Sequence, residues 1–339
     1  MRYTFKRREF IKTTTAGGIG LGLAGKLLPL NDVSNVQSGR IGIIGLDTSH
    51  STAFTKALND PASGPEFGGY KVVAAYPRGS NDIKSSVDRI PGYTDEVKKL
   101  GVEIVNSIEE LLGKVDVVLL ETNDGRLHLG QALPVMKAGK RMFIDKPIAA
   151  SLTDAIAIFE AAKHYNVPVF SSSSLRYISG AQEIAQGNIG KVLGADIYSP
   201  ATIEKTHPDL FWYGVHGVEI LFKVMGTGSR SVVRTFTNNT DLVVGTWHDN
   251  RIGTFRGIRS GRADYGGVVF GEKGISVLGK YNGYNPLLVE IIKFFQTGIV
   301  PVTPEETIEI FAFMAAAEES KKRGGAAIEM EEVIRLSVS

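Results

Sequence analysis

Two segments carry residues whose types suit proton transfer at a hydroxyl group. Residues 142–151, MFIDKPIAAS, place Asp145, Lys146 and Pro147 directly after an apolar run. A lysine there can hydrogen-bond a substrate hydroxyl and lower its pKa through its positive charge. Residues 211–226, FWYGVHGVEILFKVMG, carry a histidine in a helical pattern, and an imidazole titrates near neutral pH. Each residue alone also fits a structural role, and the lysine is the stronger of the two signals for chemistry at a hydroxyl.

A third segment, residues 40–51 with the sequence RIGIIGLDTSHS, has the pattern of a strand and turn that cradle a dinucleotide phosphate. Such a turn uses three glycines, for the tight bend, for close approach of the phosphate and for helix packing. Here Gly45 fills the first position, whereas Asp47 and His50 take the other two. If Asp47 or Ser49 caps the next helix, the amides of its first turn remain to meet a phosphate. A purely structural turn is the alternative.

The end of the next apolar run bears on the second half of a dinucleotide. An acidic residue that binds the ribose is usual there, but this chain reads YPRGS from Tyr76 to Ser80. Arg78 suits a 2′-phosphate, so the segment leaves NAD and NADP equally open. An arginine on a solvated turn is the alternative.

Residues 40–174 alternate apolar, β-rich runs with helical patterns. This alternation predicts an α/β fold, a Rossmann-type doubly wound parallel sheet with Lys146 at its carboxyl edge. From residue 175 onward strand-like runs follow one another, which predicts an α+β domain with a mostly antiparallel, open sheet. We therefore expect a dinucleotide-binding domain at 40–174 and a substrate and oligomerisation domain at 175–330. Helices are expected at 128–140, 151–166, 177–187, 215–225, 286–297 and 304–323.

The first 30 residues differ from the rest in charge and pattern. KRREFIK precedes a glycine-rich, mildly apolar stretch, which resembles a twin-arginine signal for export to the periplasm or a similar location. A basic amphipathic tail is the alternative, and a polar linker follows at 31–39. Because residues 1–30 hold six Lys and Arg against one Glu, the remainder has a net charge of about −3 rather than +2. We therefore expect no nucleic-acid partner.

Three absences from the sequence narrow the possible chemistry and location of the protein. The chain has no cysteine, which excludes disulfides, thiolate metal sites and a cysteine nucleophile. It has no run of 18 apolar residues, so we expect no membrane-spanning helix in the mature part. The histidines lack the spacing of motifs such as H-E-x-x-H, and we expect no metal.

In combination these segments resemble the Gfo/Idh/MocA family, named for glucose–fructose oxidoreductase and inositol dehydrogenase. The family's E-K-P is matched by D-K-P at 145–147, and its T-P-N followed by histidine is echoed by T-N-D at 122–124 and His128. Residues 286–325 match the family's closing helix pair. The resemblance extends over roughly residues 40–330, and each motif is modest by itself.

The resemblance implies roles for individual residues. His216 would accept the hydroxyl proton as hydride leaves for the nicotinamide, while Lys146 orients and acidifies the hydroxyl. The family's catalytic helix usually reads D-x-x-x-H, but Trp212 stands at the aspartate position, so Tyr213 is the expected substitute base. Arg176 and Trp212 are expected to bind substrate. The expected cofactor-binding residues are Gly45, Asp47, Thr48, Ser49, His50, Arg78, Ser80, Thr122, Asn123, His128, Asp145 and Lys146.

The sequence thus predicts an exported NAD(P)-dependent oxidoreductase that acts on a hydroxyl of a sugar, glycoside or cyclitol. By resemblance it would form a homo-oligomer, a dimer or tetramer. One alternative is a redox-neutral glycoside hydrolase that uses NAD transiently. Another is a cofactor-free sugar-binding or assembly protein, which Asp47 and the missing ribose acid favour. Replacing Lys146 by Ala is expected to abolish turnover with little loss of stability, because a loop lysine should not be packed.

Overall fold

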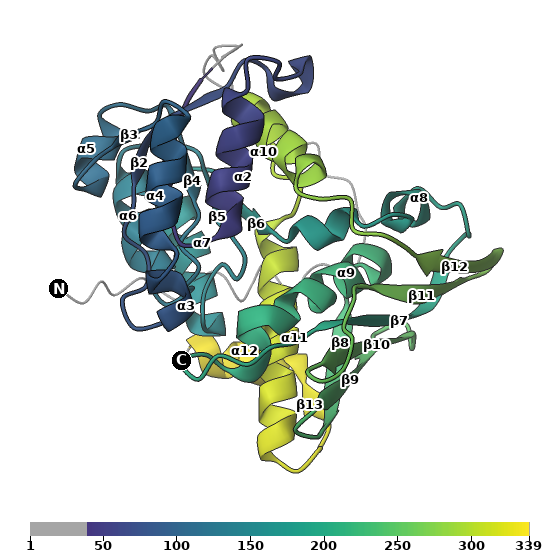
Figure 1. Ribbon diagram of the computed structural model, residues 1–339. Helices are drawn as coiled ribbons and strands as arrows, with labels where there is room; N and C mark the ends of the chain where they lie inside the picture. Colours follow the sequence, from purple (N-terminus) through teal and green to yellow (C-terminus); the bar gives the residue numbers. More distant parts are fainter. Residues whose placement is uncertain (1–38, 339) are drawn as a thin grey trace, which may run out of the picture.

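The computed structural model describes residues 39–338 and begins with a six-stranded parallel sheet in the order β3-β2-β1-β4-β5-β6 (Figure 1). Every residue of β4, β5 and β6 is buried, as expected for strands covered on both faces. The predicted doubly wound sheet is confirmed. Its strands are β1 (Arg40–Ile44), β2 (Lys71–Tyr76), β3 (Glu103–Ile104), β4 (Val117–Leu120), β5 (Met142–Asp145) and β6 (Val169–Ser172).

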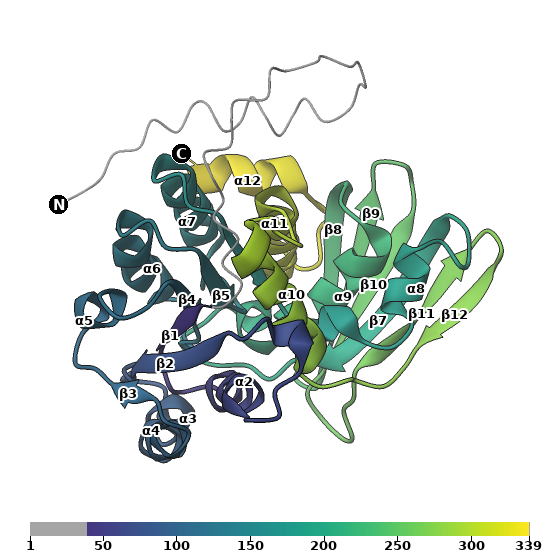
Figure 2. The same cartoon turned by 90° about the horizontal axis from the view of Figure 1, so that it is seen from above.

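Helices cover both faces of this sheet (Figure 2). On one face lie α2 (Ser49–Asn59), α3 (Lys84–Val87) and α4 (Ile90–Lys99), and on the other α5 (Ile108–Leu112), α6 (His128–Lys137) and α7 (Leu152–His164). Local sequence sets several boundaries. The side chains of Ser107 and Ser151 accept the backbone N–H three residues on and so cap α5 and α7. Pro134 lies inside α6, so it does not delay the start of that helix.

The chain crosses to the second domain through η2 (Ser174–Tyr177) and α8 (Ala181–Ala185). A seven-stranded sheet follows, in the order β12-β11-β7-β10-β9-β8-β13. Among the described residues its one parallel pairing joins β7 to β10, so the predicted, mostly antiparallel sheet is confirmed. Its strands are β7 (Val192–Pro200), β8 (Ser229–Phe236), β9 (Thr240–Trp247), β10 (Ile252–Ile258), β11 (Gly266–Gly271), β12 (Gly274–Leu278) and β13 (Ile328–Glu329).

Helices cover one face of this second sheet and leave the other open (Figures 1 and 2). The covering helices are α9 (Val215–Met225), which follows the short η3 (Leu210–Gly214), and α11 (Pro304–Lys322). In α9 every residue except Lys223 is buried, because the helix lies between the sheet and its neighbours. The terminal α12 (Met330–Val338) packs on α11 and α7 and so bridges the two domains.

One helix of the C-terminal half belongs to the core of the N-terminal domain. Helix α10 (Asn285–Thr297) lies beside α2, and its Leu287, Ile291 and Phe294 join the apolar cluster that holds Phe170 of β6 (Figure 1). The ring centroids of Phe170 and Phe294 are 4.9 Å apart. Residues 175–330 therefore do not form a separate unit, since an amphipathic helix late in the chain closes the first core.

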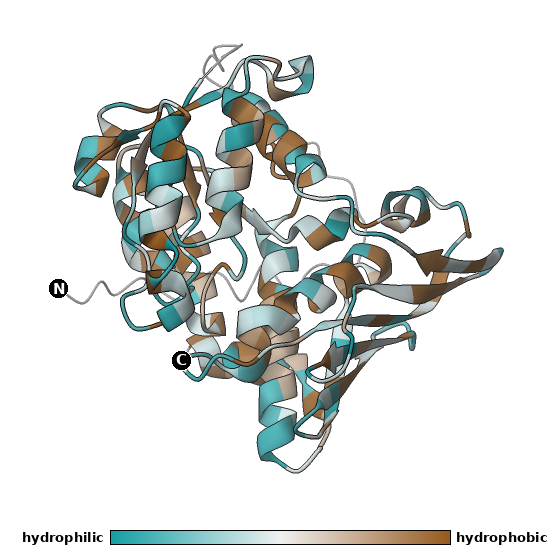
Figure 3. Ribbon diagram, in the orientation of Figure 1, coloured by the Kyte–Doolittle hydropathy of each residue, from teal (hydrophilic) through white to brown (hydrophobic). Residues whose placement is uncertain are grey.

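Hydropathy follows these layers (Figure 3). Apolar residues gather along the strands and on the inward helix faces, and polar residues lie on the outer helix faces. None of the helices between residues 39 and 338 combines the length and apolar character needed to cross a bilayer. The proposed export signal lies outside the described residues.

Candidate functional site

A pocket opens at the carboxyl edge of the parallel sheet, where the two domains meet. In open α/β sheets this edge is the usual place for a ligand. The walls come from the β1–α2 turn, from the segment at the start of α4, from the ends of β4 and β5, from η2, and from the second domain. The lining residues are Thr48, Ser49, His50, Arg89, Tyr93, Asn123, Lys146, Ser174, Leu175, Tyr213, His216, Tyr265, Tyr281 and Tyr284.

Lys146 follows β5 and reaches this pocket, but it is also packed. The residue is only 9% exposed, and its Nζ lies 3.3 Å from Oδ2 of Asp145. Burial alone would lower the lysine pKa, but Asp145 and other negative groups outweigh it and raise the pKa above its ordinary value. The side chain is therefore protonated, and its ammonium group is fixed in place by Asp145. The expectation that this loop lysine is unpacked is wrong, because the second domain closes over the edge of the sheet.

His216 stands in the first turn of α9 and meets the same pocket from the other domain. Its Nδ1 lies 2.7 Å from Oγ of Ser173, which directly follows β6. Burial, and then the positive charges of Lys146 and His50, hold the His216 pKa well below its ordinary value. The imidazole is therefore neutral at pH 7. When Nδ1–H donates to Ser173, Nε2 is left as the nitrogen that can accept a proton.

Four tyrosines surround these two groups. The hydroxyls of Tyr213 and Tyr265 are 2.8 Å apart, and the Tyr213 ring packs edge-on against His216 at 4.8 Å. Tyr281 bonds Ser174 and Tyr284 bonds Ser49. Burial raises the pKa values of Tyr265 and Tyr281, so these two remain neutral phenols. The pocket thus offers aromatic faces together with hydroxyls that donate and accept hydrogen bonds.

The β1–α2 turn keeps one glycine of the phosphate cradle and replaces the others. Gly45 has φ +88°, and a Cβ there would overlap the backbone of Thr122, so only glycine fits. The Asp47 carboxylate points away from α2. It accepts the N–H of Ser80 at 3.1 Å and that of Asn123 at 2.9 Å, which ties the loops after β2 and β4 together.

Asp47 and Ser49 do not cap α2, contrary to the interpretation that the sequence left open. The N-cap residue Thr48 makes no side-chain cap bond, and Ser49 bonds Tyr284 instead. Burial raises the Asp47 pKa. Gly79 had no predicted role, yet a Cβ on it would collide with the Asp47 carboxylate.

The start of α2 fits a phosphate in this altered form. Its first-turn amides have no side-chain cap, and Oγ1 of Thr48 is buried with no hydrogen-bond partner among residues 39–338. The Arg89 guanidinium lines the same pocket, 3.5 Å from the Asp47 carbonyl oxygen. A helix N-terminus, a free hydroxyl and a guanidinium form an anion site, so the residues present fit the pyrophosphate of a dinucleotide. Arg89 was not predicted, because it lies outside every motif.

A second hollow at the end of β2 fits the adenosine half. Arg78 is exposed beside it, whereas Ser80 is buried, with its Oγ donating to Asp82. Within the part of the chain that the structure describes, Oε1 of Gln131 is buried here without a hydrogen-bond partner. The hollow is lined by Tyr76, Arg78, Gly79, Ser80, Asn81, Val87, Ile90 and Gln131.

The predicted residues of the β4 loop divide between the pocket and its support. Asn123 lines the pocket and bonds Ser86. His128 is fully buried, with Nε2 2.6 Å from the Thr122 carbonyl oxygen and Nδ1 3.0 Å from that of Ile148. Burial lowers its pKa, although the two carbonyls act in the opposite direction. Thr122 and His128 therefore brace the loops rather than line the pocket.

The two predicted substrate-binding residues lie elsewhere. The buried Arg176 guanidinium bonds Glu219 at 3.0 Å and also Glu306, and it is absent from the described pocket lining. Trp212 is likewise absent from that lining, and its ring packs on His207 at 5.0 Å. For Arg176 the reason is electrostatic, because two carboxylates that the sequence separates by more than 80 residues converge on it.

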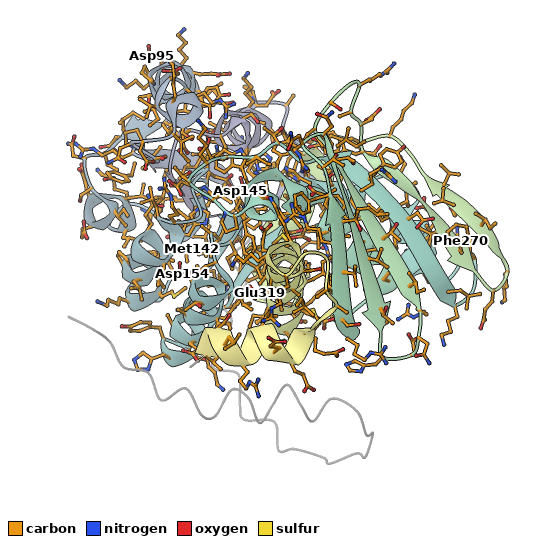
Figure 4. The ribbon with its side chains drawn as sticks, turned by 90° about the horizontal axis from the view of Figure 1, so that it is seen from below. Asp95, Met142, Asp145, Asp154, Phe270 and Glu319 are labelled. Carbon is orange, nitrogen blue, oxygen red and sulfur yellow. The ribbon has the colours of Figure 1, made fainter. Side chains whose placement is uncertain are left out.

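A buried cluster of His50, Glu121 and Asp145 lies beside Lys146. Figure 4 shows Asp145 in the interior between the helices of the N-terminal domain and the large sheet. Oδ1 of Asp145 lies 2.9 Å from Nδ1 of His50, and Oε2 of Glu121 lies 3.7 Å from the same nitrogen. Burial and then Asp145 raise the Glu121 pKa well above its ordinary value. Burial acts the same way on Asp145, but His50 and Lys146 outweigh it and hold the Asp145 pKa low.

The comparisons with known proteins agree with this architecture. Residues 39–173 match the family model GFO_IDH_MocA, described as an oxidoreductase family with an NAD-binding Rossmann fold. The matched residues span the parallel sheet and its helices, so this part of the chain is similar to the Gfo/Idh/MocA oxidoreductases. The chain is 34% identical over 122 residues to 1,5-anhydro-D-fructose reductase of Ensifer adhaerens. It is 31% identical over 102 residues to an uncharacterized oxidoreductase of Streptococcus pneumoniae.

These curated relatives are matched over about a third of their length, 36% and 28%, and the matches cover 34% and 28% of this chain. Solved structures match much more of it. A probable dehydrogenase from Thermotoga maritima has a TM-score of 0.70 at 20% identity, covering 87% of this chain and 99% of the other. A scyllo-inositol dehydrogenase from Lactobacillus casei, with bound NAD(H) and scyllo-inositol, has a TM-score of 0.69 at 17% identity, with the same coverage of both chains. At these identities the likeness shows the two-domain fold.

Proposed function

We propose that the protein is an NAD(P)-dependent oxidoreductase that acts on a hydroxyl of a sugar, glycoside or cyclitol. The observation that carries this proposal is the meeting of Lys146 and His216, from opposite domains, in one pocket at the carboxyl edge of the dinucleotide-binding sheet. Matched proteins with a sugar reductase or an inositol dehydrogenase as their stated activity support the substrate class.

The residues of the pocket divide the chemistry between them. A bound nicotinamide would supply the hydride acceptor or donor. The Lys146 ammonium hydrogen-bonds the reacting oxygen and stabilises negative charge on it. The neutral His216 accepts the hydroxyl proton in oxidation and returns it in reduction. The tyrosine hydroxyls bind other hydroxyl groups of the substrate, and the closure of the second domain over the sheet edge keeps bulk water from the reacting atoms.

The cofactor would lie across the two hollows. The first turn of α2, Thr48 and Arg89 would hold its pyrophosphate, and Asn123, which lines the same pocket, would contact the cofactor there. Arg78 and Ser80 would meet the adenosine ribose, where an exposed guanidinium suits a 2′-phosphate.

A second candidate function is a sugar-binding protein without cofactor, and Asp47 is the observation that favours it. Its buried carboxylate bridges two loops beside the anion site, and a carboxylate weakens the binding of a nearby phosphate.

The two candidates are separated by what the full chain carries and binds. Purified protein is denatured, the released small molecules are identified by mass spectrometry, and fresh protein is titrated with NAD and NADP. Release or micromolar binding of one dinucleotide, with its oxidation or reduction by a panel of sugars and inositols, supports the oxidoreductase. Free sugar released from a glycoside without net redox would indicate the hydrolase alternative. Absence of binding by either dinucleotide overturns the oxidoreductase in favour of the binding protein.

We also propose that the protein is exported through the twin-arginine pathway, on the strength of Arg7 and Arg8 and the stretch that follows them. Fusing residues 1–38 to a reporter that is active only after export tests this. Replacing both arginines by lysine should abolish export, and export that survives the change refutes the signal.

The proposed homo-oligomer rests on the open face of the second sheet. Strand register places Ile252, Phe270, Ile275 and Val277 on that face, and they are 54%, 36%, 68% and 70% exposed. An exposed apolar group of this kind marks an interface. Light scattering should give a dimer or tetramer that Val277→Glu dissociates, and a monomeric wild type refutes the proposal.

A further inference from the structure

We propose that His50, Glu121 and Asp145 bind one divalent transition-metal ion at the carboxyl edge of the parallel sheet. These residues come from α2, from the end of β4 and from the end of β5, so the ion would link three elements directly beneath the pocket. The proposal is independent of the proposed reaction. It departs from the sequence-based expectation of no metal, because the three ligands are too far apart in the chain to form a motif.

The distances suit a shared ion. One ligand atom from each residue lies within 4.8 Å of the others, with Nδ1 of His50 2.9 Å from Asp145 and 3.7 Å from Glu121. Two ligands that are each about 2.1 Å from an ion are separated by about 3.0 Å at a right angle and about 3.4 Å at the tetrahedral angle. Small adjustments of the Glu121 side chain therefore bring all three ligand atoms into coordination.

The second observation is the state of Glu121. It is fully buried, and neither of its carboxylate oxygens has a hydrogen-bond partner among residues 39–338. A buried carboxylate without a donor is costly. The one N–H that His50 Nδ1 could offer already faces Asp145 at 2.9 Å. A cation between the three side chains would satisfy Glu121 and His50 together.

The surroundings of the cluster hold its ligands in place. The His50 ring packs against Tyr284 at 4.4 Å and against Phe54 at 5.4 Å, and these contacts fix the plane of the imidazole. Asp145 uses Oδ1 toward His50 and Oδ2 toward Lys146. The carboxylate would thus bridge the ion and the lysine ammonium, and the ion would help to position Lys146 in the pocket.

The donor set indicates which ions to test. One imidazole nitrogen and two carboxylate oxygens suit Mn²⁺, Fe²⁺ or Zn²⁺, whereas Ca²⁺ and Mg²⁺ prefer oxygen ligands alone. His50 lines the pocket, so an ion can enter from that side.

The test uses the full chain, purified, stripped with chelator and titrated with Mn²⁺ and Zn²⁺ by calorimetry, with metal content measured by elemental analysis. We expect one equivalent of ion on the wild type. Glu121→Gln keeps the shape of the side chain but removes its charge, and should weaken binding by at least about tenfold. The control Glu109→Gln changes an exposed glutamate of the same domain and should bind like the wild type.

A second readout does not depend on any variant. Bound Mn²⁺ in the wild type should give an electron-spin-echo spectrum with coupling to one imidazole nitrogen. A spectrum of the aquo ion alone, binding of less than a tenth of an equivalent, or equal affinity in Glu121→Gln overturns the site.

Discussion

Replacing Lys146 by methionine tests the proposed chemistry most directly. Methionine keeps most of the volume of the stem and removes the ammonium that faces the pocket. The reacting oxygen then loses its cationic hydrogen-bond donor. Loss of one preorganised donor costs about 10²–10³ in turnover, or roughly 3–4 kcal/mol of transition-state stabilisation. We expect kcat to fall by that amount while dinucleotide affinity changes little, because the proposed phosphate contacts lie at α2 and Arg89.

The same change also affects stability, since Lys146 is buried and bonded to Asp145. Asp145 loses the ammonium of Lys146 as a partner and keeps its hydrogen bond with His50 at 2.9 Å. A hydrogen bond to a charged group contributes about 1.5–3 kcal/mol, and no longer burying the ammonium offsets part of the loss. The net loss should be about 1–2 kcal/mol, which lowers the melting temperature without unfolding the protein.

The assay compares Lys146→Met with Lys140→Met. Lys140 lies just before β5, at the opposite end of the strand, and donates to the Val115 carbonyl oxygen. Turnover of the best substrate, dinucleotide binding and melting temperature are measured for wild type and both variants. Turnover of Lys146→Met within threefold of the wild type, with dinucleotide bound normally, would refute the role of Lys146. An equal loss in Lys140→Met would mean that the fold, rather than the ammonium, had been disturbed.

Three further predictions follow from other groups. Asp47→Asn should tighten dinucleotide binding severalfold in calorimetry, because it removes a negative charge beside the phosphate. It should also lower the free energy of unfolding by about 1–2 kcal/mol, because the loops after β2 and β4 lose one hydrogen-bond acceptor. Weaker dinucleotide binding would contradict the first expectation. Burial, Lys146 and His50 hold the pKa of His216 well below 6.5, against the opposing effect of Asp145. We therefore expect kcat/KM not to fall as the pH is lowered from 8 to 6.5. A fall near pH 7 that disappears in His216→Asn would refute this. Burial raises the pKa of Glu219 from 4.5 to about 7, so the folded protein holds this proton more tightly than the unfolded chain does. The resulting stabilisation is fully present below pH 4.5, and up to about 3 kcal/mol of it is lost as the pH rises to 7. Glu219→Gln should flatten that decline in urea unfolding, and an unchanged slope contradicts the assignment.

The positions of the strands along the first domain could be predicted from local pattern, but their order in the sheet could not. The run VDVVLLET before the β4 loop and RMFID before Lys146 are apolar almost throughout, as strands buried on both faces must be, and the structure buries every residue of β4 and β5. Helix α10 shows what local pattern does not predict. Its amphipathic pattern predicted a helix at 286–297, but a pattern states only that one face is buried and not against which sheet.

The site divides in the same way. The type and local position of Lys146 pointed to chemistry at a hydroxyl, because it follows a strand whose end lies at the sheet edge. The role expected for His216 came from the family resemblance. Arg176 lies outside the described pocket lining, and its partners Glu219 and Glu306 come from distant helices that no local pattern connects to it. Trp212 also lies outside that lining, and its position in a motif does not tell which ring it packs against.

The sequence by itself determined the alternation of elements, the glycine that the first turn requires at Gly45, and the lysine at the end of β5. These features depend on backbone conformation and on the period of apolar residues, which neighbouring residues largely decide. Only the tertiary structure decided that Asp47 turns into the loops and that Glu121 meets His50 and Asp145. Burial and electrostatic partners arise when segments up to 95 residues apart are brought side by side. The charge state and chemistry of these carboxylates are therefore set by the tertiary structure.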